Sequence, residues 1–432
     1  MRRPVDVARP ILRLPGGRLP PLLRDTTFRR FLTGQTISLL GDQVSLLAVP
    51  LVGVLVLHAN AAQMGYLPAA GLAPSLLFSL LAGAQVDRRG HRRAGMLAAE
   101  LGRAGLLATI PLAYVLGSLS LAHLYVAAFA GGTLDVLFFV SYSTLFVSIV
   151  PADQYMQGNS LLSGSRSLMQ IAGQSVAGLL VAVATAPGAL ALDAVSFLAS
   201  AAALARIHPA EPATQAATRG HLISGVRFIR HSPTVRAALG ATATVNYFNF
   251  VFVAVFILYA TATLHVPPTQ LGLVFGLGAI GGLVGASATT WIDRRIGIGR
   301  TFMLGCILFP APLLLVPLAT GSHTVVLGCL LLAEFGSALG VLILDISIGS
   351  IFATVIPDHL RARVSGAYRT VNYGIRPLGA LTGGALGSTI GLRATLWIAA
   401  IGGLTGILWL IGSPLPKLKT LTSEDQERGT GR

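Results

Sequence analysis

Charged side chains are scarce in this sequence. They make up 11% of its 432 residues, while 53% of the residues are hydrophobic. The mean hydropathy is +0.73, more apolar than a soluble domain needs to build its core. Lipid is therefore the expected solvent for most of the chain. No polar stretch is long enough for a soluble catalytic or signalling domain.

Motifs for common energy-coupling and catalytic sites are also missing. Neither a Walker loop G-x-x-x-x-G-K-[ST] nor an H-E-x-x-H metal motif occurs, which argues against ATP-driven transport and metal-dependent enzymology. Cys306 and Cys329 both fall inside expected spans, so no disulfide framework is implied. Residues 1–24 lack an apolar run and are neither a cleaved signal peptide nor a span. We expect no enzyme activity, no metal and no cofactor.

Apolar runs broken by glycine, proline and charge predict twelve membrane-spanning helices. A polar stretch at 207–236 separates the first six from the last six and ends in a short amphipathic segment. The expected fold is all-α and integral to the membrane, with two pseudo-symmetric six-helix bundles. Its expected parts are a disordered cytoplasmic tail (1–27), an N-terminal bundle (28–206), a cytoplasmic linker with an interfacial helix (207–236), a C-terminal bundle (237–412) and a cytoplasmic tail (413–432).

Basic residues give the chain a net charge of +15, and they gather in alternate gaps between the apolar runs. This alternation indicates membrane topology and not a nucleic-acid partner. By the positive-inside rule both termini are cytoplasmic. Lys417 and Lys419 are the only lysines among 31 basic side chains, a bias typical of GC-rich bacterial genomes. We expect a multi-pass protein of the bacterial cytoplasmic (inner) membrane.

The second half of the chain repeats the first at an offset of 206 residues. The offset superposes Gly173 on Gly379, Arg30 on Arg236, Val150-Pro151 on Ile356-Pro357, and Asp87-Arg88-Arg89 on Asp293-Arg294-Arg295. Because one offset serves four separate pairs, we infer two homologous halves. Halves of this kind are related by a pseudo-two-fold axis along the membrane normal.

Two loops carry a family motif. They read GAQVDRRGHRR at 83–93 and TTWIDRRIGIGR at 289–300, and they resemble the cytoplasmic loop G-x-x-x-D-R-x-G-R-[RK] of the major facilitator superfamily, with His91 where Arg or Lys is usual. The alternative is that the arginines serve topology alone. The resemblance implies a cytoplasmic gate formed by Gly83, Asp87, Arg88, Gly90, Asp293 and Arg294.

Three longer stretches resemble one branch of that superfamily, the macrolide-efflux and siderophore exporters known as transmembrane secretion effectors. They are FRRFLTGQTISLLGDQV at 28–44, VPADQYMQGNSLLSGSRSLMQIAGQSVAGLL at 150–180, and IPDHLRARVSGAYRTVNYGIRPLGALTGG at 356–384. The resemblance implies export. The exporter motif G-P-x-x-G-G of the fifth span keeps two glycines here and has Gln174 in place of proline.

Ionisable groups inside spans are costly in lipid and are functional candidates by default. In the first span Gln35, Ser38, Asp42 and Ser45 share one helix face. A carboxyl group in a polar cavity can exchange a proton as the cavity opens to each side in turn, although it can equally be a static hydrogen-bond acceptor. Asp193, at the start of the sixth span, is expected to cap its helix. The proton-coupling candidates are Asp42, Asp135, Glu334 and Asp345.

Further polar side chains in the spans are candidates for a substrate cavity. Arg166 and Arg376 could pair with Asp42 or Asp135, or could meet an anionic substrate, while Glu100 and Arg103 have the spacing of an intrahelical ion pair. Aromatic residues of the seventh span would favour an amphiphilic molecule over a sugar, although they could equally serve packing. The cavity candidates are Gln35, Ser38, Arg166, Gln170, Asn246, Asn249, Asn372 and Arg376.

Together these features predict a secondary active transporter that works by alternating access. The expected activity is efflux of an amphiphilic small molecule, such as a macrolide-like drug or a siderophore-like metabolite, driven by the proton gradient. The expected partners are that substrate and the bilayer, without nucleic acid, and the protein is expected to be a monomer. Uptake by proton symport, a non-transporting membrane sensor and a lipid flippase remain as alternatives.

Overall fold

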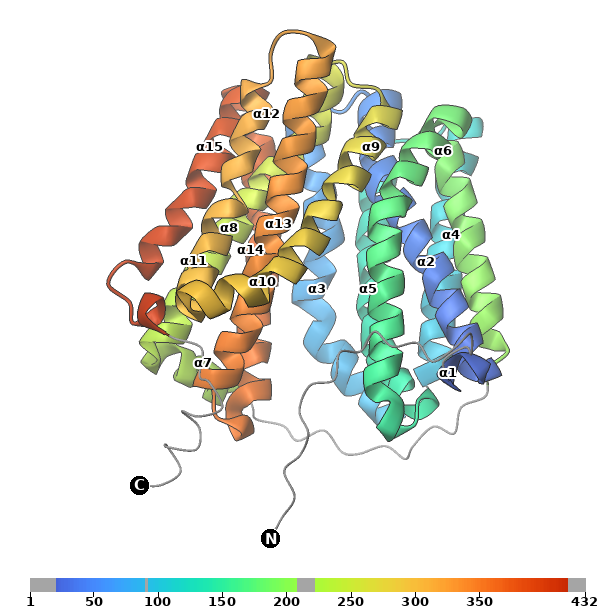
Figure 1. The fold of residues 1–432 in the computed structure, drawn as a ribbon. Coiled ribbons are helices and arrows are strands. Elements are labelled where there is room, and N and C mark those ends of the chain that lie inside the picture. The colour runs from blue at the N-terminus through green and yellow to red at the C-terminus, as the bar shows by residue number, and fades with distance from the viewer. Residues whose placement is uncertain (1–20, 90–91, 208–221, 419–432) are drawn as a thin grey trace, which may run out of the picture.

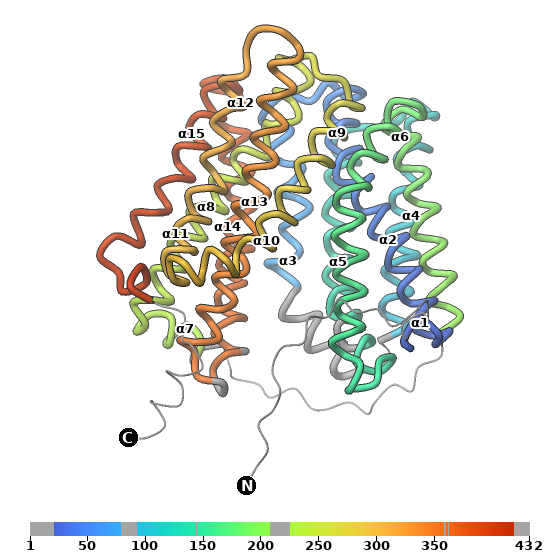
Figure 2. Tube along the Cα trace, in the orientation of Figure 1, coloured from blue at the N-terminus to red at the C-terminus, as the bar shows by residue number. Residues whose placement is uncertain are grey.

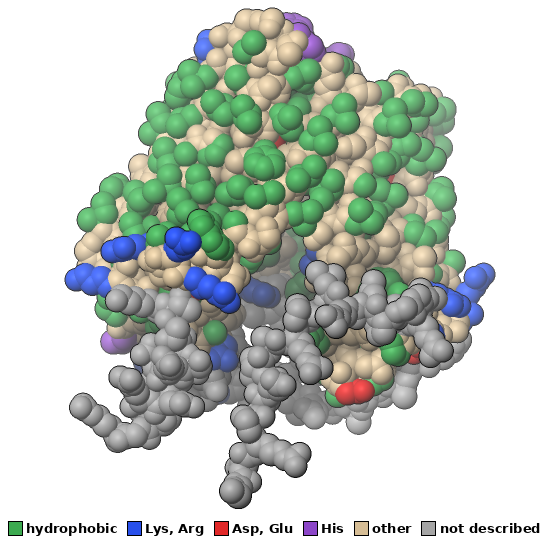
Figure 3. All heavy atoms as spheres, viewed as in Figure 1, with side chains coloured by type: hydrophobic (Ala, Val, Ile, Leu, Met, Phe, Trp, Pro, Cys, Tyr) green, Lys and Arg blue, Asp and Glu red, His purple; other side chains and the backbone are tan. Residues whose placement is uncertain are grey.

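The structure is a computed structural model that describes residues 21–89, 92–207 and 222–418. The side chains at 79–89, 92, 143–144, 222–224, 358–359 and 362 lie outside this description. Apart from short connections, the described chain is helical, and it forms two bundles that stand side by side (Figure 1). Large apolar side chains are exposed over much of the face seen in Figure 3, and Lys and Arg gather near the end where the termini lie. That distribution fits a lipid-embedded surface.

The first bundle contains six crossings. After α1 (Pro21–Arg24) come α2 (Thr26–Leu51), which a π-helical turn (Val52–Val56) extends, α3 (Ala61–Arg89), α4 (Arg92–Val115), α5 (Leu121–Ile149) and α6 (Tyr155–Ala205). Helix α6 holds 51 residues and is kinked at Thr185. Since a bilayer takes about 20 residues per helix, α6 supplies the fifth and sixth crossings.

The second bundle follows a short linker helix, α7 (Leu222–His231), which packs on α14. Its elements are α8 (Pro233–Leu258) with a π-helical turn (Tyr259–Thr263), α9 (Pro268–Gly278) and α10 (Ile280–Ile296), α11 (Ile298–Leu308) and α12 (Leu315–Leu318), α13 (His323–Val355), α14 (Asp358–Thr389) and α15 (Leu392–Leu404) with a 3₁₀ turn (Thr405–Leu410). The pairs α9/α10 and α11/α12 each make one crossing.

The prediction of twelve crossings is confirmed. Nine segments of the described chain are long and apolar enough to span a bilayer. One of them, Ala152–Ala205, crosses twice, and α3 and α14 complete the twelve. Helix α14 falls short on hydropathy because it carries Arg361, Arg363, Arg369 and Arg376.

The internal repeat is visible in the backbone. The two π-helical turns begin 207 residues apart, at Val52 and Tyr259, and each is followed by a histidine with positive φ, His58 (51°) and His265 (54°). The offset is one residue longer here than in the segments aligned from the sequence. Thr185 (φ 65°, ψ 167°) and Gly391 (φ 89°, ψ 158°) lie 206 residues apart and share one conformation.

Thr185 is strained in that conformation. A positive φ with ψ near 180° is populated almost only by glycine and costs other residues about 1–3 kcal/mol, and the equivalent position in the second half is a glycine. We expect Thr185→Gly to raise the free energy of unfolding by about 1 kcal/mol after the roughly 0.5–1 kcal/mol cost of glycine's greater freedom in the unfolded chain. Thermal unfolding in detergent checks this, with Thr185→Ala as the control that keeps the strain. A midpoint that falls in Thr185→Gly would contradict it.

The two bundles meet at the end of the molecule farthest from the termini, which we call the closed end (Figure 2). There α3 packs on α14 and α6 packs on α9. A Cβ atom on Gly65 would lie 2.7 Å from the Cα of Gly384, and one on Gly178 would lie 2.9 Å from the Cα of Gly272. Backbones approach this closely only where neither residue has a side chain. The internal repeat relates these two glycine contacts to each other, so both halves of the chain contribute alike to the closure.

Candidate functional site

A cavity of about 570 Å³ lies between the bundles, on the terminus side of the closed end. That volume is in the range that holds a drug-sized ligand. Residues from α2, α3, α4, α5, α6 and α14 line it. Among the predicted site residues it brings together Gln35, Ser38, Asp42, Asp135 and Arg166. Polar residues of α2, α5 and α6 therefore meet at one cavity.

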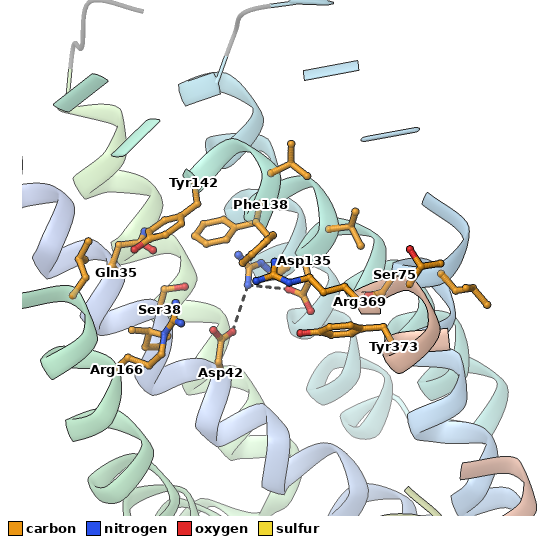
Figure 4. Close-up of a pocket in the computed structure, with 18 of the residues that line it drawn as sticks. Gln35, Ser38, Asp42, Ser75, Asp135, Phe138, Tyr142, Arg166, Arg369 and Tyr373 are labelled. Carbon is orange, nitrogen blue, oxygen red and sulfur yellow. Dashed lines mark hydrogen bonds and ion pairs between the residues drawn. The ribbon is translucent and has the colours of Figure 1, made fainter. Parts of the chain in front are cut away.

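Arg103 of α4 is the centre of the polar wall, and its ion pairs with Asp42 and Asp135 are the dashed lines of Figure 4. Its Nη1 atom lies 3.0 Å from Oδ1 of Asp135 on α5 and 3.4 Å from Oδ1 of Asp42 on α2. The arginine side chain is only 7% exposed, whereas those of Asp42 and Asp135 are 42% and 61% exposed to the cavity. One buried cation thus ties three helices together through two carboxylates that solvent can reach.

Glu100, on the same helix as Arg103, adds a third carboxylate to this cluster. Oε1 of Glu100 lies 3.9 Å from Nη2 of Arg103, so the predicted intrahelical pair is present. Glu100 is fully buried and accepts hydrogen bonds from Ser200 (2.9 Å) and Ser38 (3.5 Å). The guanidinium also lies over the rings of Phe138 (4.4 Å) and Phe197 (4.7 Å), which hold its plane by cation–π attraction.

The charges of this cluster do not balance. One guanidinium faces three carboxylates, Asp42, Glu100 and Asp135. In a low-dielectric surrounding an uncompensated negative charge is costly, and a bound proton removes it. Glu100 is sealed from the cavity, whereas Asp42 and Asp135 open onto it. These two carboxyl groups can therefore exchange protons with cavity water.

The sequence suggested that Asp193 caps a helix near the surface. The structure instead buries this side chain. It is 1% exposed, inside the second arm of α6, and accepts hydrogen bonds from Ser196 at 2.9 Å and from Ser45 of α2. That arm begins at the Thr185 kink, about two turns before Asp193, so the carboxylate is not in its first turn. Ser45, predicted to share the face of Asp42, thus joins α2 to α6.

Several predicted cavity residues lie elsewhere. The amide nitrogen of Asn246 lies 3.3 Å from the amide oxygen of Asn372, which joins α8 to α14 inside the second bundle. Asn249 lies beside Phe309 and Pro310 of the same bundle. Gln170 is exposed but does not line the cavity. Arg376 stacks on the rings of Tyr373 (4.2 Å) and Phe250 (5.3 Å), and its expected pairing with Asp42 or Asp135 is taken by Arg103.

The aromatic lining comes from other helices than expected. Phe252 and Phe256 of the seventh span are buried in the core and stack on each other. The rings that face the cavity are instead Phe138, Phe139 and Tyr142 of α5 and Tyr373 of α14. An amphiphile remains the ligand type that such a lining suits.

The remaining candidates stand apart from the cavity or outside the description. Glu334 and Asp345 lie on α13, where Glu334 packs on Gly278 of α9 and Asp345 is exposed; neither lines the cavity. Gly83, Asp87 and Arg88 are described only in their backbone, as part of α3, and Gly90 lies outside the described residues. Asp293 and Arg294 lie near the end of α10 (Ile296), in the loop motif that the family resemblance assigns to the gate.

Sequence reasoning missed the central role of Arg103 and the whole contribution of Arg369, Thr370 and Tyr373 to the cavity. The spacing of Arg103 from Glu100 pointed to a local pair, and no local pattern reveals the partners on α2 and α5. A signal for Arg369 was available, because Arg369, Asn372, Tyr373 and Arg376 follow one another at helical spacing and form a polar stripe on the eleventh span.

Comparison with known proteins gives one family. A model described as the Major Facilitator Superfamily matches residues 31–380. The multidrug efflux pump Tap of Mycolicibacterium fortuitum is 25% identical over 393 residues, which cover 88% of this chain and 93% of the relative. The pump of the same name from Mycobacterium tuberculosis (strain ATCC 25618 / H37Rv) is 27% identical over 420 residues, with 90% and 94% covered.

Solved structures share the fold at lower identity. A mutant form of the nucleoside transporter NupG superposes with a TM-score of 0.74 at 11% identity, over 89% of this chain and 99% of that one. A bacterial homologue of the iron transporter ferroportin, in an inward-facing state, gives a TM-score of 0.72 at 17% identity, over 91% and 99%. Both likenesses concern the twelve-helix fold alone.

Proposed function

Because this chain belongs to the Major Facilitator Superfamily, whose model covers residues 31–380, we propose that it is a proton-coupled exporter of an amphiphilic small molecule in a bacterial cytoplasmic membrane. The Tap relatives are named multidrug efflux pumps, which supports the direction of transport. Exposed arginines near the terminus end, such as Arg294, Arg295 and Arg300, support a cytoplasmic location of that end.

The observation that carries the proposal is the cavity with its buried cation. The cavity is shut at the closed end and contains two solvent-reachable carboxylates, Asp42 and Asp135, on one guanidinium. When the cavity opens to the other side of the membrane, a proton that enters it neutralises one carboxylate. The attraction between that carboxyl group and Arg103 then becomes weaker. Helices α2, α4 and α5 then change their mutual attraction, so protonation can favour one arrangement of the bundles.

Efflux measurements test this proposal. Cells that express the wild type should accumulate less of a hydrophobic dye or of a macrolide than empty-vector cells, and a protonophore should cancel the difference. We expect Asp42→Asn to cancel it as well at equal expression, because the amide cannot exchange a proton. Asp153→Asn, an exposed carboxylate in the short 3₁₀ turn before α6, is the matched control and should export normally.

Each other outcome points to a different activity. Export that survives both the protonophore and Asp42→Asn would remove proton coupling from the proposal. Higher accumulation in energised cells that carry the protein would indicate uptake by symport instead of export. Equal accumulation across dyes and macrolides would exclude broad export of those compounds.

A further inference from the structure

Two arginines of the cavity have no acidic partner among the residues that the structure describes. Arg166 of α6 and Arg369 of α14 both line it (Figure 4), and both side chains are exposed there. No hydrogen bond or ion pair joins either of them to another residue of the described chain. The two acids of the lining, Asp42 and Asp135, are already held by Arg103. Two of the three cations in the cavity wall therefore have no carboxylate within ion-pair distance in the described part of the chain.

The depth of these arginines argues against a purely topogenic role. Arg166 lies eleven residues after Tyr155, where α6 begins, and Arg369 lies eleven residues after Asp358, where α14 begins. Eleven residues are three turns, or roughly 16 Å along a helix axis. Arginines that only set topology lie at the ends of spans. A cation this far from its helix start is costly unless a polar cavity or a ligand receives it.

We propose that Arg166 and Arg369 form an anion subsite, and that the ligand is an amphiphile with a carboxylate, phosphate or sulfonate group. This inference rests on the proposed function only for the direction in which such a ligand moves. Tyr142 and Tyr373, the latter one turn after Arg369, also line the cavity, and the sides of their rings that face it can contact the apolar body of the ligand. Arginine suits the anionic group because its planar fork binds such oxygens in pairs.

The subsite also joins the two bundles. Arg166 belongs to the first half and Arg369 to the second. The repeat does not relate them, because an offset of 206 residues places Asn372 opposite Arg166 and Ser163 opposite Arg369. An anion that contacts both arginines holds the halves together at this level of the cavity. Such a ligand has different affinities for the two arrangements of the bundles, so its binding shifts the equilibrium between them.

A matched pair of probes tests the subsite without any gradient. The sulfonate 8-anilinonaphthalene-1-sulfonate and the neutral N-phenyl-1-naphthylamine share one aromatic body. Binding to purified protein in nanodiscs is measured for the wild type, Arg166→Gln, Arg369→Gln and the double variant, with Arg300→Gln, an exposed arginine outside the cavity wall, as the control. The wild type should bind the sulfonate more tightly than the amine.

We expect each cavity variant to bind the sulfonate about tenfold more weakly, as for the loss of one hydrogen bond to a charged group. The neutral amine should change by less than about twofold on the same scale. Arg166→Lys and Arg369→Lys should keep part of the preference, which separates charge from packing if a glutamine variant folds poorly. A wild type with no preference for the sulfonate, or an equal loss for both probes, would overturn the subsite. Failure of proton-driven efflux with this preference intact would overturn only the transport proposal.

Discussion

Arg103→Leu should abolish transport and lower the free energy of unfolding by about 3–5 kcal/mol, the usual result when one partner of a buried ion pair is removed. The guanidinium is 7% exposed and holds carboxylates from α2 and α5 as well as Glu100 from its own helix. Leucine fills part of the volume but leaves Glu100, which is fully buried, with serine hydroxyls as its remaining partners. Thermal unfolding of the purified protein and efflux in cells measure the two effects.

Two further variants identify the cause of that loss. Adding Glu100→Gln to Arg103→Leu removes the stranded charge while it keeps an acceptor for Ser38 and Ser200, so roughly half of the lost stability should return. Transport should not return, because Asp42 and Asp135 still lack their shared cation. Arg103→Lys keeps the charge without the fork and should be intermediate in both measurements. If Arg103→Leu unfolds like the exposed-site control Arg300→Leu, the ion cluster does not hold these helices together.

The sequence predicted the architecture of this protein well because lipid imposes one strong rule. Backbone polar groups must be satisfied within each crossing, so apolar runs of sufficient length become helices regardless of detail. The pattern separates even the kinked α6 into two crossings, since the Ala186-Pro187-Gly188 stretch breaks the apolar run. The repeat is equally visible, because the loop motifs and glycines that it aligns stand out in an otherwise uniform composition.

The site was harder to predict than the fold. A helical stripe shows which residues share a face, and this was enough to bring Gln35, Ser38 and Asp42 into the cavity. The partner across the gap depends on how helices are rotated against each other, which packing decides. For that reason the sequence pairs Arg103 with its neighbour Glu100, although it is closest to Asp135 on another helix. The asparagines of α8 were likewise assigned to the cavity, whereas Asn246 joins α8 to α14.

The second large effect is expected at the closed end. Gly384→Val adds a side chain whose Cβ would lie 2.9 Å from the Cα of Gly65 and 3.0 Å from the carbonyl oxygen of Ala61. Backbone cannot yield to such an overlap without moving the bundles apart, and overpacking of this kind costs about 1–3 kcal/mol or more. Because each 1.4 kcal/mol changes a population ratio about tenfold, the arrangement in which this end is open should become a major state.

Cysteine labelling can follow that shift directly. Ala61 is 7% exposed and lies within the closed end, so Ala61→Cys in a background with Cys306→Ala and Cys329→Ala should react slowly with a maleimide. Gly384→Val should raise the labelling rate by about tenfold or more and reduce export to a similar extent. Gly105→Val makes the same substitution in a helix where a Cβ meets nothing within 4 Å, so it carries the same helix cost without the overlap and should leave both rates unchanged. Slow labelling in Gly384→Val, with export intact, would mean that the bundles do not rely on this contact to close. Fast labelling with export lost would show that transport requires the two halves to reach backbone contact at this end in every cycle.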